Sequence, residues 1–75
     1  MEPELLVGRV FGVSPAGLDD SASNRTLEAW DSLGHLALIT EVQAEYGIEL
    51  SAEDILSMTS LAHIKRVLTA RGIRW

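Results

Sequence analysis

Three side chains near the middle of the chain could do chemistry together: Asp31, Ser32 and His35. A serine and a histidine three residues apart on a helix lie on one side and can approach each other, as a nucleophile and its base must. Hydrolysis also needs an acid beyond the imidazole and an oxyanion hole. Asp31 directly precedes the serine and is poorly placed to orient His35, so a small hydrolase ranks third among our interpretations.

Ser32 also has a binding interpretation. If Asp31 caps a helix that begins at Ser32, unpaired backbone amides and the positive end of the helix dipole surround the serine. A phosphate attached to its hydroxyl would be held by both. The alternative is that Ser32 is an ordinary first-turn residue and Asp31 only caps the helix.

Composition narrows the function classes. The chain has no cysteine, hence no disulfide framework, no cysteine zinc site and no thiol of its own. Its two histidines do not make a metal site. A net charge of −5 argues against nucleic acid, because phosphate neutralisation needs a basic face. Residues 28–54 contain no Lys or Arg, which favours partners with basic patches or simply keeps the protein soluble.

Neither a membrane span nor a signal peptide is predicted. No run approaches the roughly 18 apolar residues of a transmembrane helix. The opening MEPELL is acidic and lacks a basic region before a hydrophobic one. We therefore expect a cytoplasmic protein without a membrane partner.

The elements that must position Ser32 are all helices, because no segment alternates as a strand does. The length of 75 residues predicts one domain, residues 1–75, with a marginal core. We expect a four-helix bundle whose first helix covers Glu2–Phe11. A loop over residues 12–30 follows, and such a long loop must be functional or pinned. The expected pins are Leu18, Leu27 and Trp30.

The remaining helices have clear end signals. The second helix runs over Ser32–Tyr46 and stops at Gly47. Ser51 and Asp54 resemble a capping box that opens a short third helix through Leu56. A last helix is predicted over Ser60–Arg71, with Thr59 as its cap. Its inward residues would be Leu61, Ile64 and Leu68.

The second helix carries two apolar stripes where a surface helix normally has one. The first stripe faces the core and consists of His35, Leu38, Ile39, Val42 and Tyr46. The second lies on the opposite side and consists of Leu33, Leu36, Ala37, Thr40 and Ala44. This second stripe either packs inside the domain or docks a partner.

The stretch WDSLGHLALITEVQAEYGIEL resembles the acyl carrier protein family. In that family a D-S-L triplet opens the second helix, and its serine carries 4'-phosphopantetheine through a phosphodiester. The resemblance extends over nearly the whole chain, from the first helix through the long loop to EYGIELSAEDI before the short third helix. D-S-L alone is a weak motif, but its position at a helix start in a small acidic protein is specific.

The resemblance implies a role for each candidate residue. Ser32 would bear the arm, and Asp31 would cap the helix and help the phosphopantetheinyl transferase that loads the arm from coenzyme A. The partner-docking surface would consist of Leu33, Leu36, Ala37, Thr40 and Glu41. The core and any acyl cavity would be lined by Leu38, Ile39, Val42, Leu50, Ile55 and Met58.

The departures from the family concern the carried unit. Fatty-acid carriers have acidic residues along the outer face of the second helix, where this chain has Gly34, Ala37, Gln43 and Ala44. Peptidyl carriers usually have glycines before the serine, where this chain has Ala29-Trp30-Asp31.

We therefore expect a monomeric, discrete, non-enzymatic carrier of acyl or aminoacyl units in a polyketide-like or other specialised pathway. Its partners would be a loading ligase or acyltransferase and a downstream synthase or transferase. The alternative is a helical interaction module that uses the Leu33/Leu36 face and carries no prosthetic group.

Overall fold

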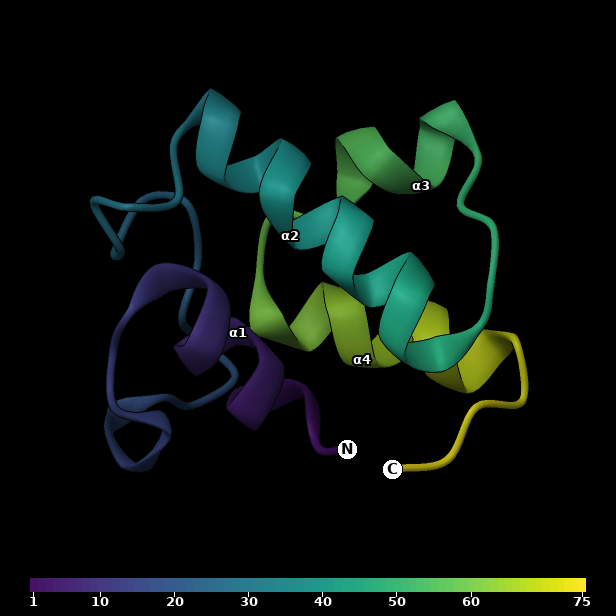
Figure 1. Ribbon diagram of the computed structural model, residues 1–75, viewed down its shortest axis with the longest axis horizontal. Coiled ribbons are helices and arrows are strands. Elements are labelled where there is room, and N and C mark those ends of the chain that lie inside the picture. The colour runs from purple at the N-terminus through teal and green to yellow at the C-terminus, as the bar shows by residue number, and fades with distance from the viewer.

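The computed structural model describes residues 1–75 and is all-helical, which confirms the predicted four-helix bundle (Figure 1). The elements are α1 (Pro3–Phe11), a 3-10 turn η1 (Pro15–Gly17), α2 (Ser32–Tyr46), α3 (Ala52–Ser57) and α4 (Leu61–Ala70). The turn η1 was not predicted. In Figure 1, α2 crosses the molecule with α3 on one side and α1 and α4 on the other, and the two chain ends lie at the same edge.

Local residue chemistry sets the ends of α1 and α2. Pro3 stands in the first turn of α1, where its missing N–H costs no hydrogen bond. The helix ends at Gly12, whose φ of 68° is left-handed. Asp31 caps the start of α2, and Gly47 ends that helix with a φ of 63°. Both boundaries of α2 agree with the sequence prediction.

The short helix α3 is held by the predicted capping box. The Ser51 hydroxyl accepts from the Asp54 N–H at 3.1 Å, and the Asp54 carboxylate accepts from the Ser51 N–H at 3.2 Å. The backbone N–H of Ser51 is the main reason why the pKa of Asp54 lies below its usual value, and the Arg71 side chain adds to this effect. This box gives a six-residue helix a defined start.

The predicted cap of α4 is wrong by one residue. Ser60, rather than Thr59, is the N-cap, and its hydroxyl accepts from the His63 N–H at 3.1 Å. The Thr59 carbonyl instead accepts from the Asn24 N–H at 3.0 Å, within an isolated antiparallel bridge between Ser23 and Ser60. Pairing with the long loop thus holds Ser60 extended, with φ −145° and ψ 158°, and the helix starts after it.

The core joins α1, α2, α4 and the loop, and α3 packs against it through the half-buried Ile55. Its buried members are Leu6, Val7, Phe11, Ala22, Trp30, Leu38, Ile39, Val42, Leu50, Met58, Leu61, Ile64 and Leu68. Burying one such large side chain is worth about 1.5–3 kcal/mol. The three predicted inward positions of α4 are all in this cluster.

The long loop is pinned at several points. Trp30 is only 2% exposed and stacks on Phe11 with ring centroids 5.1 Å apart. Leu18 and Leu27 are half-buried against the core, as predicted. Because it is pinned in this way, the loop forms a fixed wall beside the start of α2.

An ion-pair junction fixes the loop and α1 to α4. Lys65 Nζ lies 2.7 Å from an Asp20 oxygen and 2.6 Å from a Glu4 oxygen. The hydrogen bonds that the Lys65 ammonium donates to Asp20 and to Glu4 raise the pKa of Lys65, since both favour its charged form.

Candidate functional site

Ser32 is the first residue of α2, and its side chain is free. The Asp31 carboxylate accepts from the Gly34 N–H at 2.8 Å and so caps the helix. Ser32 is exposed, and its hydroxyl makes no hydrogen bond within the protein. The backbone N–H groups of Ser32 and Leu33 are also without protein partners. A nucleophilic hydroxyl therefore stands beside two unpaired donors and the positive end of a 15-residue helix.

Gly34 allows the loop backbone to approach this helix start. A Cβ atom at Gly34 would lie 2.1 Å from the Ala29 carbonyl oxygen and 3.0 Å from the Phe11 ring. Only a residue without a side chain fits there. Sequence reasoning missed this role, although a glycine inside the first turn of a predicted helix is a signal of close backbone approach.

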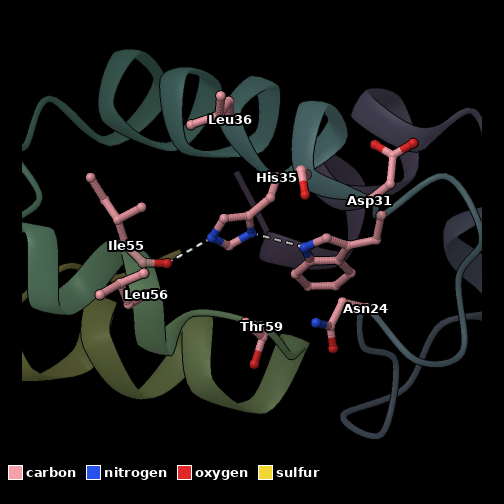
Figure 2. Close-up of a pocket in the computed structure, with 9 residues that line it drawn as sticks. Asn24, Asp31, His35, Leu36, Ile55, Leu56 and Thr59 are labelled. Carbon is pink, nitrogen blue, oxygen red and sulfur yellow. Dashed lines mark hydrogen bonds between the residues drawn. The ribbon is translucent and has the colours of Figure 1, made fainter.

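His35 ties the loop, α2 and α3 together. Its Nδ1 accepts from the Trp30 indole N–H at 3.0 Å, and its Nε2 donates to the Ile55 carbonyl oxygen at 2.6 Å (Figure 2). An indole only donates and a carbonyl only accepts, so these partners define a neutral ring with its proton on Nε2. Both ring nitrogens are thus occupied by groups other than Ser32. The hydrolase interpretation consequently lacks its general base.

An open cleft of about 540 Å³ lies directly beside Ser32. Its lining comes from the loop, α2, α3 and the α3–α4 linker: Asn24, Trp30, Asp31, Ser32, His35, Leu36, Ile55, Leu56 and Thr59. In Figure 2, Leu36 lies on the α2 side of the His35 bridge, while Asn24 and Thr59 lie near each other on the far side. The cleft thus has apolar and polar parts.

The predicted docking residues form an exposed face of α2. Leu33 and Leu36 are 79% and 58% exposed, although both are large and apolar. Ala37, Thr40 and Glu41 line a second hollow of about 460 Å³ between α1 and α2. The second stripe is therefore not packed inside the domain. Its docking role stays a prediction.

Glu41 is not a free charge. Arg9 of α1 lies 3.2 Å from a carboxylate oxygen of Glu41 and 3.6 Å from one of Glu45. These are the only acidic residues within α2, so one arginine offsets half of the negative charge of that helix.

The residues predicted to line the core and an acyl cavity are buried or half-buried, unlike the exposed Leu33 and Leu36. Leu38, Ile39, Val42, Leu50 and Met58 are buried in the core cluster. Ile55 is half-buried and is the only one of the six predicted residues that lines the cleft beside Ser32 or the hollow between α1 and α2. An acyl cavity lined by all six residues stays a prediction.

Comparison with known families gives one match. The model of the phosphopantetheine attachment site family matches residues 5–68, which is most of the chain. The chain therefore belongs to the family of domains that carry covalent 4'-phosphopantetheine. No curated protein matches the chain.

The structure shows neither a cluster of metal-binding side chains nor a helix that could span a membrane. No group of three or more His, Cys, Asp or Glu side chains could hold a metal ion. None of the helices has the length and apolar character needed to cross a membrane.

Proposed function

We propose that Ser32 Oγ is the attachment point of 4'-phosphopantetheine and that the protein is a non-enzymatic carrier. The observation that carries the proposal is the exposed, unpaired hydroxyl at the start of α2, inside the region that matches the attachment-site family. In the phosphodiester, the free N–H groups of Ser32 and Leu33 would hold the phosphate oxygens. Asp31 keeps this helix end ordered through its bond to Gly34.

The prosthetic group supplies the thiol on which the unit is carried as a thioester. This complements a chain that has no cysteine of its own. The protein contributes position: a fixed helix start, a pinned loop and an open cleft beside the attachment atom. The partner enzymes then catalyse the reactions of the carried unit. They bind the carrier one after another, and the carrier is a monomer.

The proposed partners are a phosphopantetheinyl transferase, a loading ligase or acyltransferase, and a downstream synthase or transferase. Leu33 and Leu36 would form the dry centre of the surface that these enzymes share. A small apolar patch is suited to weak, successive contacts with several enzymes.

The carried unit belongs, in our proposal, to a specialised pathway rather than to general fatty-acid synthesis. The outer positions of α2 are neutral at Gly34, Ala37, Gln43 and Ala44. The two glutamates that remain share one arginine, Arg9. An enzyme that recognises a strongly acidic second helix would therefore bind this α2 weakly.

The decisive experiment is the intact mass after incubation with coenzyme A, Mg²⁺ and a broad-specificity phosphopantetheinyl transferase. We expect one added phosphopantetheine on the parent chain and none on Ser32→Ala, which should melt at the parent temperature. A folded parent that gains no mass would sink the carrier proposal. The exposed Leu33/Leu36 face would then favour the interaction module.

Docking is tested in the same reaction. Leu36→Asp should lower kcat/KM for loading by about tenfold or more, since it puts a charge into the dry centre. Leu5→Asp is the matched control, because Leu5 is also half exposed but lies on α1. Equal effects of the two substitutions would remove α2 as the docking surface.

A further inference from the structure

The hollow between α1 and α2 carries a charge pair at the protein surface. Its lining residues are Arg9, Val10, Ala37, Thr40 and Glu41. A terminal nitrogen of the Arg9 guanidinium donates to a Glu41 oxygen at 3.2 Å and lies 3.6 Å from a carboxylate oxygen of Glu45. Because Glu41 and Glu45 are the only acidic residues of α2, one cation of α1 contacts every carboxylate of that helix.

Local chemistry favours Arg9 in this place. The residue stands in the last turn of α1, where the negative end of the helix dipole favours a cation. Glu41 and Glu45 are four residues apart on α2, so their like charges repel each other unless a cation lies near both. A guanidinium stays protonated at any physiological pH, so the pairing persists over that whole range.

The ion pair borders the surface that partner enzymes are proposed to cover. Ala37 and Thr40 belong to the same stripe of α2 as the exposed Leu36, and they also line the hollow. The side chains of Arg9 and Glu41 are 52% and 46% exposed, so both are within reach of an enzyme. An interface centred on Leu36 would therefore meet the ion pair at its polar rim.

We propose that Arg9 is a specificity-determining residue of the carrier. It neutralises the carboxylates of α2 and thereby selects against enzymes that dock through a basic surface. A lysine or arginine of such an enzyme, on approaching Glu41, would be repelled by the guanidinium that already contacts this carboxylate. An enzyme whose docking surface is apolar and uncharged at this place would not meet that repulsion. The inference rests on the proposed carrier function.

Discrimination of this kind acts mainly on the encounter between carrier and enzyme. Charges at the rim of an interface change kon and its salt dependence. The screening length is about 8 Å at physiological ionic strength, so a guanidinium 3.2 Å from Glu41 offsets its field more strongly than a distant cation does. We therefore expect Arg9 to affect the KM of the carrier as a substrate and to leave kcat unchanged.

The test measures loading kinetics with a phosphopantetheinyl transferase whose carrier-binding surface is basic. Arg9→Gln should lower KM by about three- to tenfold without a change in kcat. The gain should shrink at about 0.5 M NaCl, because salt screens exposed charges.

Arg66→Gln is the matched control for the loss of one positive charge. Arg66 is exposed on α4 and makes no ion pair, and its replacement changes the net charge of −5 by the same amount. This variant should keep KM within about twofold of the parent value.

The double variant Arg9→Gln/Glu41→Gln tests whether the gain comes from the uncovered carboxylate. It removes the cation and one anion together, so KM should return most of the way to the parent value. Both Arg9 variants should melt near the parent temperature, because exposed ion pairs contribute little to stability.

The outcomes separate this inference from the carrier function. Equal KM values for Arg9→Gln and Arg66→Gln would overturn the role of Arg9 and leave the carrier intact. A raised KM for Arg9→Gln would also overturn it and would make Arg9 a direct contact of the enzyme. A full gain in the double variant would overturn the neutralisation of Glu41. Absence of loading in the parent and in every variant would remove the proposed function and, with it, this inference.

Discussion

The indole N–H of Trp30 and the Nδ1 atom of His35 lie 3.0 Å apart and form a hydrogen bond across the start of α2. The same imidazole donates from Nε2 to the Ile55 carbonyl at 2.6 Å. One side chain of α2 thereby connects the pinned loop on one side with α3 on the other. The cleft beside Ser32 owes its shape to this connection, because the loop, α2 and α3 all contribute to its lining.

The strength of this connection is measurable with a double-mutant cycle. Trp30→Phe leaves Nδ1 without a donor, and His35→Phe leaves the indole N–H and the Ile55 carbonyl unpaired. Each variant should lose on the order of 1–3 kcal/mol in the free energy of unfolding, with a coupling of about 0.5–1.5 kcal/mol. Urea unfolding measures both. Trp75→Phe is the control and should stay within about 0.5 kcal/mol of the parent, and a coupling near zero would remove the bond as a stabilising contact.

Asp31 has two separable roles, a cap and a charge. Asp31→Ala removes the acceptor for the Gly34 N–H and should lower the free energy of unfolding by about 1 kcal/mol. Asp31→Asn keeps an acceptor and should retain most of that stability. If the charge assists the transferase, both variants should slow loading. Normal loading of Asp31→Asn, measured by intact mass over time, would limit Asp31 to capping.

Gly34→Ala should destabilise the protein although alanine normally favours a helix. The new Cβ would lie 2.1 Å from the Ala29 carbonyl, so the loop backbone must move. We expect a loss of about 1–3 kcal/mol in thermal or urea unfolding. Gly17→Ala is the matched control, since open space surrounds that position. A stabilised Gly34→Ala protein would show that the loop does not press on α2 in solution.

Alkali should destabilise the protein through Tyr46. Its hydroxyl donates to the Met1 carbonyl at 2.7 Å. Burial, with the nearby charges of Glu45 and Glu4, raises its pKa from 10.0 to about 12. The folded state thus favours the neutral phenol, so this contribution is complete below pH 10 and is lost as the pH rises through about 12.

This titration is simple to follow because Tyr46 is the only tyrosine. The tyrosinate absorbance of the folded protein should rise with a midpoint near 12, and the unfolded chain should titrate near 10. Tyr46→Phe should lack the stability change in this pH window. Coincident midpoints for the folded and unfolded chains would refute the burial of the phenol.

Local signals in the sequence were sufficient for the helices and for the position of Ser32 at the start of α2. The helix ends are set by local caps at Asp31, Gly47 and the Ser51/Asp54 box. Each cap acts within a few residues, so its effect can be predicted without knowledge of the tertiary structure. The cap of α4 was misplaced because pairing of Thr59 with Asn24, 35 positions earlier, cannot be read from local sequence.

The site around Ser32 was less predictable for the same reason. His35 was placed on the inward stripe, but its bonds to Trp30 and Ile55 depend on how the loop and α3 pack. The close approach of Ala29 to Gly34 is likewise a tertiary fact. Periodicity predicts which face of a helix is buried, and it does not predict which polar atoms meet there.

The burial of Trp30 also gives the protein an optical probe. Trp30 is 2% exposed and lines the cleft, whereas Trp75 is 43% exposed at the chain end. A dissolved quencher such as iodide should reach the indole of Trp75 and quench its fluorescence, but it should not reach the indole of Trp30. Trp75→Phe should therefore abolish most of the quenchable fluorescence. In that variant the remaining emission comes from an indole beside Ser32. Its wavelength then reports loading, unloading and movement at the cleft without any added label.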